Sequence, residues 1–180
     1  MSDLCNTIVV IGPLRSDRAL VAPADDAWTA RLVVLDTNVL LGLWLWRDPR
    51  LDGLQAALNG GQLRWVVDAP TWGEWLHEVR PARCAAQQRA PAEVLAGALG
   101  AAPLCWHGRP ARDMAAPTGR LPLRCSDPDD QMFVDLALRS GARWLLTRDR
   151  ALLRLRRPAA AMGLRVCNPD GLPLSHWASP

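Results

Sequence analysis

The stretch RLVVLDTNVLLGLWLW (residues 31–46) predicts a buried strand that leads directly into a helix. Its first part, RLVVLD, is a short apolar run ending in an acid, as expected of a strand buried on both faces of a sheet. Thr37 and Asn38 follow Asp36 and can cap the helix VLLGLWLW. A strand followed by a helix begins a βαβ unit, so we expect an α/β fold around this stretch.

Strands and helices keep alternating along the rest of the chain. Further strands are expected at residues 64–68 (RWVVD), 144–147 (WLLT) and 164–168 (LRVCN). Helices are expected at 51–59, from Pro70 to about 79, after the acidic turn SDPDD (126–130) and at 151–155. Residues 81–124 are expected to add one or two short helices, such as 91–99. Because strands alternating with helices pair in parallel, the predicted fold is a three-layer α/β/α sandwich with a mostly parallel central sheet.

The composition favours one domain with a packed core, since the chain has 180 residues and is 49% hydrophobic. Residues 31–180 are expected to form that domain, and residues 1–30 an N-terminal extension with one short strand near Ile8. The five cysteines lie at least twenty residues apart, which excludes CxxC redox motifs and zinc ribbons. No apolar run reaches the ~20 residues of a membrane span, and the N-terminus is a poor signal peptide. We therefore expect a cytoplasmic protein without membrane contact.

Acidic residues stand at the ends of predicted strands and at the start of one helix. Asp36 ends the first strand, Asp130 opens a helix and Asp149 follows the strand WLLT. Ligands of parallel sheets bind outside the carboxyl ends of the strands, so we expect these acids to share one crevice. Neighbouring carboxylates repel each other unless a cation neutralises them, and the hard ions Mg²⁺ and Mn²⁺ prefer oxygen ligands. The pattern predicts a metal site.

Each acid also has a simpler structural interpretation. Asp36 could merely cap a helix, and SDPDD could be a solvated first turn that the helix dipole favours. Glu74 stands among tryptophans, where it could form an ion pair with Arg80 or Arg83. The joint pattern, rather than any single acid, favours a functional site.

Two further acids are expected to take no part in the site. Glu78 lies one helical turn after Glu74 and is expected to face solvent or form a salt bridge. Asp135 is expected on the solvated face of its helix, away from the acidic turn. These residues serve as a contrast to the candidate site.

The joint pattern resembles the PIN-domain ribonucleases. The resemblance rests on VVLDTNVLL (33–41), the helix that carries Glu74, DPDDQMFVDLAL (127–138) and WLLTRD (144–149), and it runs from about Val33 to Pro169. It is closest to the bacterial subgroup regarded as toxins of toxin–antitoxin pairs. The resemblance implies an α/β nuclease domain that hydrolyses RNA with Mg²⁺ or Mn²⁺. It also implies a cognate antitoxin as partner and allows a homodimer.

The resemblance also implies roles for particular residues. The acidic quartet that would hold metal and carry catalysis is Asp36, Glu74, Asp130 and Asp149. Asp36 and Asp130 would bind the ion directly, Asp149 directly or through water, and Glu74 would orient water or bind a second ion. The neighbouring residues expected to meet substrate are Asn38, Thr147 and Arg148. Arg148 stands where the family often has Gly, so it could bind phosphate or crowd the site.

The charge around the last acid favours a nucleic-acid substrate. Residues 139–165 hold eight arginines and one aspartate, and among them Arg154 and Arg156 are expected to contact phosphates. Trp44, Trp46 and Trp144 occupy apolar positions and are expected in the core rather than stacked on bases. The sequence thus predicts a metal-dependent ribonuclease, with a non-catalytic PIN-like module that binds RNA or a partner as the alternative.

Overall fold

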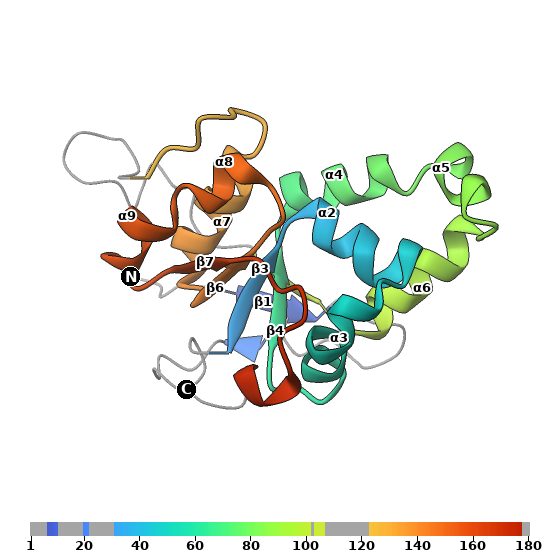
Figure 1. Cartoon of the computed structure of the whole chain (residues 1–180), viewed down its shortest axis with the longest axis horizontal. Coiled ribbons are helices and arrows are strands. Elements are labelled where there is room, and N and C mark those ends of the chain that lie inside the picture. Colours follow the sequence, from blue (N-terminus) through green and yellow to red (C-terminus); the bar gives the residue numbers. More distant parts are fainter. Residues whose placement is uncertain (1–6, 11–19, 22–30, 102, 107–122, 178–180) are drawn as a thin grey trace.

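A computed structural model describes residues 7–10, 20–21, 31–101, 103–106 and 123–177 (Figure 1). Its sheet has seven strands in the order β2-β1-β5-β4-β3-β6-β7. The strands are β1 (Thr7–Val10), β2 (Leu20–Val21), β3 (Leu32–Leu35), β4 (Arg64–Val67), β5 (Leu104–Trp106), β6 (Trp144–Leu146) and β7 (Arg165–Cys167). The run β5-β4-β3-β6-β7 is parallel throughout, whereas β1 pairs antiparallel with both β5 and β2. The predicted mostly parallel sheet is confirmed.

The strand β3 shows why the sheet is buried on both faces. Its side chains alternate between two cores: Val33 and Leu35 pack in one, Leu32 and Val34 in the other. Every residue of β3 is at most 1% exposed, so each face needs a covering layer. This is the packing expected of a central parallel strand, and it confirms the three-layer sandwich.

The two covering layers consist of different helices (Figure 1). On one face lie α2 (Thr37–Leu40), the π-helix η1 (Leu41–Trp46), the 3₁₀ turn η2 (Pro49–Leu51), α3 (Asp52–Asn59), α4 (Ala69–Glu78), α5 (Pro81–Ala86) and α6 (Pro91–Gly100). On the other lie α7 (Gln131–Ser140), α8 (Arg150–Leu153) and α9 (Arg156–Ala160). The helix α4 leads from the carboxyl end of β4, and α7 lies against β3 and β6.

The first predicted helix changes its winding part-way. It begins as α2 and continues as the π-helix η1, which ends at Arg47 in the left-handed conformation (φ 49°). Trp44 and Trp144 are buried as predicted, and Trp44 stacks on Trp65 with ring centroids 5.2 Å apart. The prediction for Trp46 is wrong, since its side chain is 43% exposed. Trp46 is the last residue of the helix, where the chain turns away from the core.

The strand β5 lies within residues 81–124, where only helices were expected. It pairs in parallel with β4 on one side and antiparallel with β1 on the other. The strand β1 matches the short strand expected near Ile8, so part of the predicted N-terminal extension joins the sheet. The remainder of residues 1–30 lies outside the described residues, apart from β2.

The C-terminal segment folds back over α3. The short helix η4 (Leu174–Trp177) buries Trp177 edge-on against Trp144, with ring centroids 5.3 Å apart. Upstream, the Gly171 N–H donates to the carbonyl oxygen of Arg50 at 2.7 Å. The backbone of the C-terminal segment approaches α3 closely at Gly53. A side chain at this position would not fit, because a Cβ there would lie 2.1 Å from the Leu172 carbonyl oxygen. Across the described ranges, no helix is long and apolar enough to cross a membrane.

Candidate active site

Asp36 lies at the carboxyl end of β3, where two parallel strands end side by side. Its backbone N–H donates to the Leu146 carbonyl oxygen of β6 at 3.0 Å, and its side chain is almost wholly buried. The Thr147 hydroxyl donates to Asp36 Oδ2 at 2.7 Å, and the Asn38 N–H approaches Oδ1 at 3.4 Å. Asp36 does cap α2, as the simpler interpretation allowed, but its Oδ2 is held by a residue 111 positions away.

Thr147 connects Asp36 to Asp149. Its hydroxyl oxygen accepts a hydrogen bond from the Asp149 N–H at 2.8 Å while it donates to Asp36. Asp149 Oδ1 in turn accepts from the N–H groups of Ala151 and Leu152, which caps α8. The wholly buried Thr147 therefore sets the position of two expected site acids.

Asp130 stands at the N-terminus of α7, and its carboxylate makes no capping hydrogen bond there. Its pKa is raised to about 6, chiefly by burial and also by the nearby charges of Asp36 and Asp149. The pKa of Asp36 is also raised, chiefly by burial and also by Asp149, against the lowering effect of the Thr147 and Asn38 hydrogen bonds. The charges of Asp36 and Asp149 thus both act on Asp130, and that of Asp149 acts on Asp36.

Three of the four predicted acids line one pocket of about 600 Å³: Asp36, Glu74 and Asp130. Asn38 also lines it, whereas Thr147, Arg148 and Asp149 do not. The other described lining residues are Thr37, Leu41, Glu78, Arg83, Pro128, Asp129, Met132 and Phe133. Asp149 is connected to the pocket through Thr147 and through its charge.

The helix α4 brings two glutamates to this pocket. It begins with a capping box in which Asp68 and Thr71 bond each other's backbone N–H groups, and Pro70 occupies its first turn. Glu74 and Glu78 are four residues apart and therefore lie on one face of the helix. Glu78 was not expected in the site. Its spacing of four residues from Glu74 is the feature of the sequence that could have placed it there.

The ion-pair partner of the nearby arginines is Glu78, not Glu74. Glu78 Oε1 lies 3.7 Å from Arg80 Nη2, and Oε2 pairs with Arg83 Nη1. The salt bridge expected for Glu78 is confirmed, but the pair suggested for Glu74 is absent from the described contacts. Glu74 therefore reaches the pocket without a competing cation of its own.

Polar contacts fix α4 and α7 on either side of the pocket. Asp68 Oδ2 accepts a hydrogen bond from Arg139 Nη2 at 2.7 Å, which joins the start of α4 to the end of α7. Asp135 is partly buried and accepts from Gln131 Nε2 at 2.7 Å, so its expected place on a solvated face is wrong. The reason is that Gln131 also bonds backbone groups of Leu123 and Cys125, which cover this side of α7.

The donor chemistry of the pocket suits a hard divalent cation, because its acids offer only carboxylate oxygens. The Thr37 hydroxyl also lines the pocket, is buried and has no hydrogen-bond partner among the described residues. Within the same residues, however, no three acids, histidines or cysteines stand close enough to form a ready-made metal centre. The side chains fit a cation by type, and binding one would need them to draw together.

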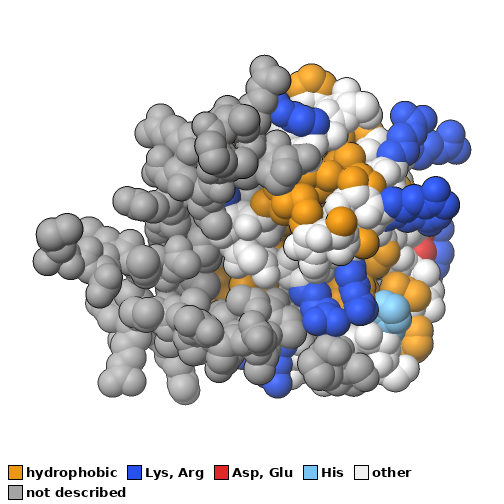
Figure 2. Space-filling model, turned by 90° about the vertical axis from the view of Figure 1, so that its left-hand side faces the viewer, with side chains coloured by type: hydrophobic (Ala, Val, Ile, Leu, Met, Phe, Trp, Pro, Cys, Tyr) orange, Lys and Arg blue, Asp and Glu red, His pale blue; other side chains and the backbone are white. Residues whose placement is uncertain are grey.

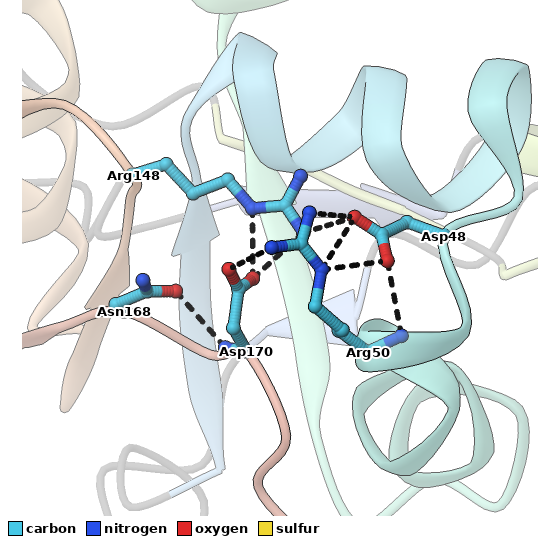
Figure 3. A network of polar contacts seen from close by, with 5 residues as sticks. All are labelled: Asp48, Arg50, Arg148, Asn168 and Asp170. Atoms are coloured by element: carbon cyan, nitrogen blue, oxygen red, sulfur yellow. Dashed lines mark hydrogen bonds and ion pairs between the residues drawn. The ribbon is translucent and has the colours of Figure 1, made fainter.

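Arg148 does not line the pocket. Its side chain takes part in a network of ion pairs (Figure 3). Its Nε donates to Asp170 Oδ1 at 2.7 Å, and its Nη2 to Asp48 Oδ2 at 2.6 Å. Arg50 pairs with the same two acids, and its hydrogen bonds, followed by those of Arg148, lower the pKa of Asp48. The guanidinium passes over Gly42, where a Cβ would lie 3.1 Å from Nη1. Arg148 thus joins the segment after β6 to the start of η2 and to the C-terminal segment.

Arg148→Gln is expected to lower the free energy of unfolding by about 1–2 kcal/mol, because two mostly buried carboxylates lose a charged partner. The loss stays below that of a fully buried pair because Arg50 remains. RNA affinity in EDTA should not change, since this guanidinium is already occupied. Urea unfolding and fluorescence anisotropy with labelled RNA measure the two effects. Arg154→Gln is the control; equal losses of RNA affinity in both variants would assign Arg148 to substrate binding.

Arg154 and Arg156 are exposed and lie outside the acidic pocket. They belong to the layer formed by α8 and α9, which are labelled in Figure 1. Figure 2 shows the face of the molecule that lies to the left in Figure 1. Arginine side chains gather there around a hydrophobic patch, with little acidic surface between them (Figure 2). Contact of Arg154 and Arg156 with RNA remains a prediction.

The fold and the pocket define the class of protein: an α/β sandwich with carboxylates at the carboxyl ends of neighbouring parallel strands. The family model of the PIN domain matches residues 32–151, which is 120 of the 180 residues. The chain therefore belongs to the PIN domain family. The match contains Asp36, Glu74, Asp130 and Asp149. No curated protein matches the chain, and neither does any solved structure.

Proposed function

We propose that this protein is a metal-dependent endoribonuclease whose catalytic residues are Asp36, Glu74, Asp130 and Asp149. The observation that carries the proposal is the pocket at the carboxyl end of β3, which Asp130 and the buried Asp36 both line. The Asp130 carboxylate makes no capping hydrogen bond to α7, and its pKa is raised. A carboxylate that repels its neighbours and caps no helix is costly unless a cation joins it. Membership of the PIN domain family supports nuclease chemistry.

Each residue of the chain has a separate task in this proposal. Asp36 and Asp130 would hold Mg²⁺ or Mn²⁺ directly, and Asp149 would hold it directly or through water. Thr147 keeps Asp36 and Asp149 in place. A divalent ion held there would lower the pKa of a water molecule and offset the negative charge of the phosphate. Glu74, at the wall of the pocket, would orient the attacking water. The water oxygen bonds to phosphorus and gives up its proton to solvent, the P–O bond to the leaving nucleoside breaks, and the departing oxygen takes up a proton from solvent.

The wider biological role follows from the resemblance to the toxins of toxin–antitoxin pairs. We propose cytoplasmic RNA as substrate and a cognate antitoxin as the partner that keeps the enzyme inactive, with a homodimer as a compatible state. A small antitoxin gene beside this one would support the pairing.

The test is RNA cleavage by the purified chain with Mn²⁺, Mg²⁺ or EDTA. We expect cleavage with either ion, none with EDTA, and none by Asp36→Asn, because the ion loses a direct ligand. Asp52→Asn is the matched control: it removes the same charge from an exposed position in the first turn of α3. RNA binding without cleavage in the parent and in both variants would favour the non-catalytic module instead.

A further inference from the structure

Arg83 is the one basic residue among the described residues that line the acidic pocket. The same wall holds five acids: Asp36, Glu74, Glu78, Asp129 and Asp130. An RNA phosphate that approaches such a wall is repelled, and one divalent cation offsets only part of that charge. A positively charged side chain fixed within the pocket therefore offsets this repulsion and favours binding of an anionic substrate.

The local structure holds Arg83 at this position. It lies in α5, which begins at Pro81 directly after α4, and the buried Cys84 anchors this short helix in the core. The Arg83 N–H donates to the Arg80 carbonyl oxygen at 3.1 Å, which closes the first turn. Its side chain is 34% exposed, so the guanidinium is supported by the protein and still open to solvent.

Glu78 orients Arg83 without using all of its donors. The ion pair joins Glu78 Oε2 to Arg83 Nη1, and Glu78 is the acid that pairs with Arg83 in the described part of the chain. A guanidinium has five N–H donors in a planar fork, so Nε and Nη2 can still bind phosphate oxygens. Glu78 and Glu74 lie on the same face of α4, and both line the same pocket as Arg83.

We propose that Arg83 is a substrate-binding residue that holds an RNA phosphate in the acidic pocket, next to the phosphodiester to be cleaved. The inference rests on the proposed function for its substrate, RNA, and adds a residue that the sequence did not assign. The arginines expected to bind substrate do not fill this place: Arg148 is engaged by Asp48 and Asp170, and Arg154 and Arg156 lie outside the pocket.

Arg80 provides a matched control for the test. It pairs with the same Glu78 and differs from Arg83 by lying outside the pocket, with 51% of its side chain exposed. The variants Arg83→Gln and Arg80→Gln therefore remove the same charge from the same ion-pair cluster. Thermal melts of both variants test whether they fold, and Arg83→Lys keeps the charge without the planar fork.

The experiment measures binding of a fluorescein-labelled single-stranded RNA in EDTA at several NaCl concentrations. Arg83→Gln should weaken binding about tenfold, as expected for a lost charge-assisted hydrogen bond. The slope of log K against log salt should flatten by about 0.7, the value for one phosphate contact on a single strand. Arg80→Gln should bind like the parent, and Arg83→Lys should recover part of the loss. With Mn²⁺, Arg83→Gln should raise KM more than it lowers kcat.

Equal RNA affinity and equal salt slope in Arg83→Gln and Arg80→Gln would overturn the inference. So would an Arg83→Lys variant as weak as Arg83→Gln when both melt well below Arg80→Gln, because Arg83 would then serve only to hold Glu78. The two proposals fail separately. RNA binding that depends on Arg83 but is not followed by cleavage would reject the proposed nuclease activity and support the phosphate contact. Cleavage that does not depend on Arg83 would support the nuclease activity and reject the phosphate contact.

Discussion

Asp130→Asn is expected to abolish metal-dependent cleavage of RNA and, at the same time, to make the metal-free protein more stable above pH 6. Loss of groups that merely orient a metal ligand costs about 10–100-fold in activity, so loss of a direct ligand should cost at least about 100-fold. A residue that is purely structural would lower stability together with activity. The two effects of opposite sign therefore identify Asp130 as a functional acid.

The sign of the stability change follows from the pKa of Asp130. Its pKa is raised from 3.8 to about 6 in the folded protein, so ionisation opposes folding. The stability that the protonated carboxyl contributes is fully present below pH 3.8 and is lost as the pH rises through 6. Because the side chain is partly exposed, screening reduces the effect to about 1 kcal/mol at pH 8. Asparagine removes this pH dependence.

Urea unfolding in EDTA at pH 4, 6 and 8 measures the effect, with Asp52→Asn as the control for a lost surface charge. Parallel pH profiles for the parent and Asp130→Asn would contradict the prediction. Added Mg²⁺ should stabilise the parent at pH 8 and lose its effect near pH 5, because protons compete with the ion for the carboxylate.

Gly53→Ala is expected to lower the free energy of unfolding by about 2 kcal/mol. A Cβ at this position would lie 2.1 Å from the Leu172 carbonyl oxygen and 3.1 Å from the Pro173 carbonyl carbon, both of which are backbone atoms. No side-chain rotation can relieve this contact, so the C-terminal segment must move off α3. Overpacking costs about 1–3 kcal/mol, and alanine returns at most about 1 kcal/mol through its better helix propensity.

Gly73→Ala is the opposite control for this prediction. Gly73 lies inside α4, and a Cβ added there would have nothing within 4 Å, so alanine should stabilise the protein by up to about 1 kcal/mol. Thermal melts and urea unfolding of the two variants should therefore shift in opposite directions. Tryptophan fluorescence should also change in Gly53→Ala. The displaced C-terminal segment carries Trp177, which packs against Trp144. A shift of the same sign in both variants would show that the close approach at Gly53 is not tight.

The strand and helix within residues 31–46 could be predicted because the sequence features that specify them are local. An unbroken apolar run such as Leu32–Leu35 predicts a strand buried on both faces, and the capping residues and prolines predict where helices begin. The strand β5 was missed because it has only three residues within an Ala-, Arg- and Pro-rich region. Its strand conformation depends on pairing with β4 and β1, which local sequence does not encode.

The candidate site shows the same division. The acids Asp36, Asp130 and Asp149 could be predicted from their places at strand and helix ends, together with the resemblance to the PIN-domain ribonucleases. Two further residues that line the pocket, Glu78 and Arg83, carry only a weak local signal. Their importance depends on where α4 and α5 lie relative to β3 and α7, which follows from long-range packing.

The order of the strands β3, β4, β6 and β7, the apolar run that buries β3 on both faces and the acids at the ends of these elements can be read from the amino-acid sequence. The position of β6 beside β3, which lets Thr147 reach Asp36 across 111 positions, is visible only in the folded chain. The same holds for Arg148, which pairs with Asp48 and Asp170 instead of facing the pocket, and for Arg83, which does face it. The physical reason is that helix and strand signals are local, whereas strand order and ion-pair partners depend on which distant surfaces bury each other.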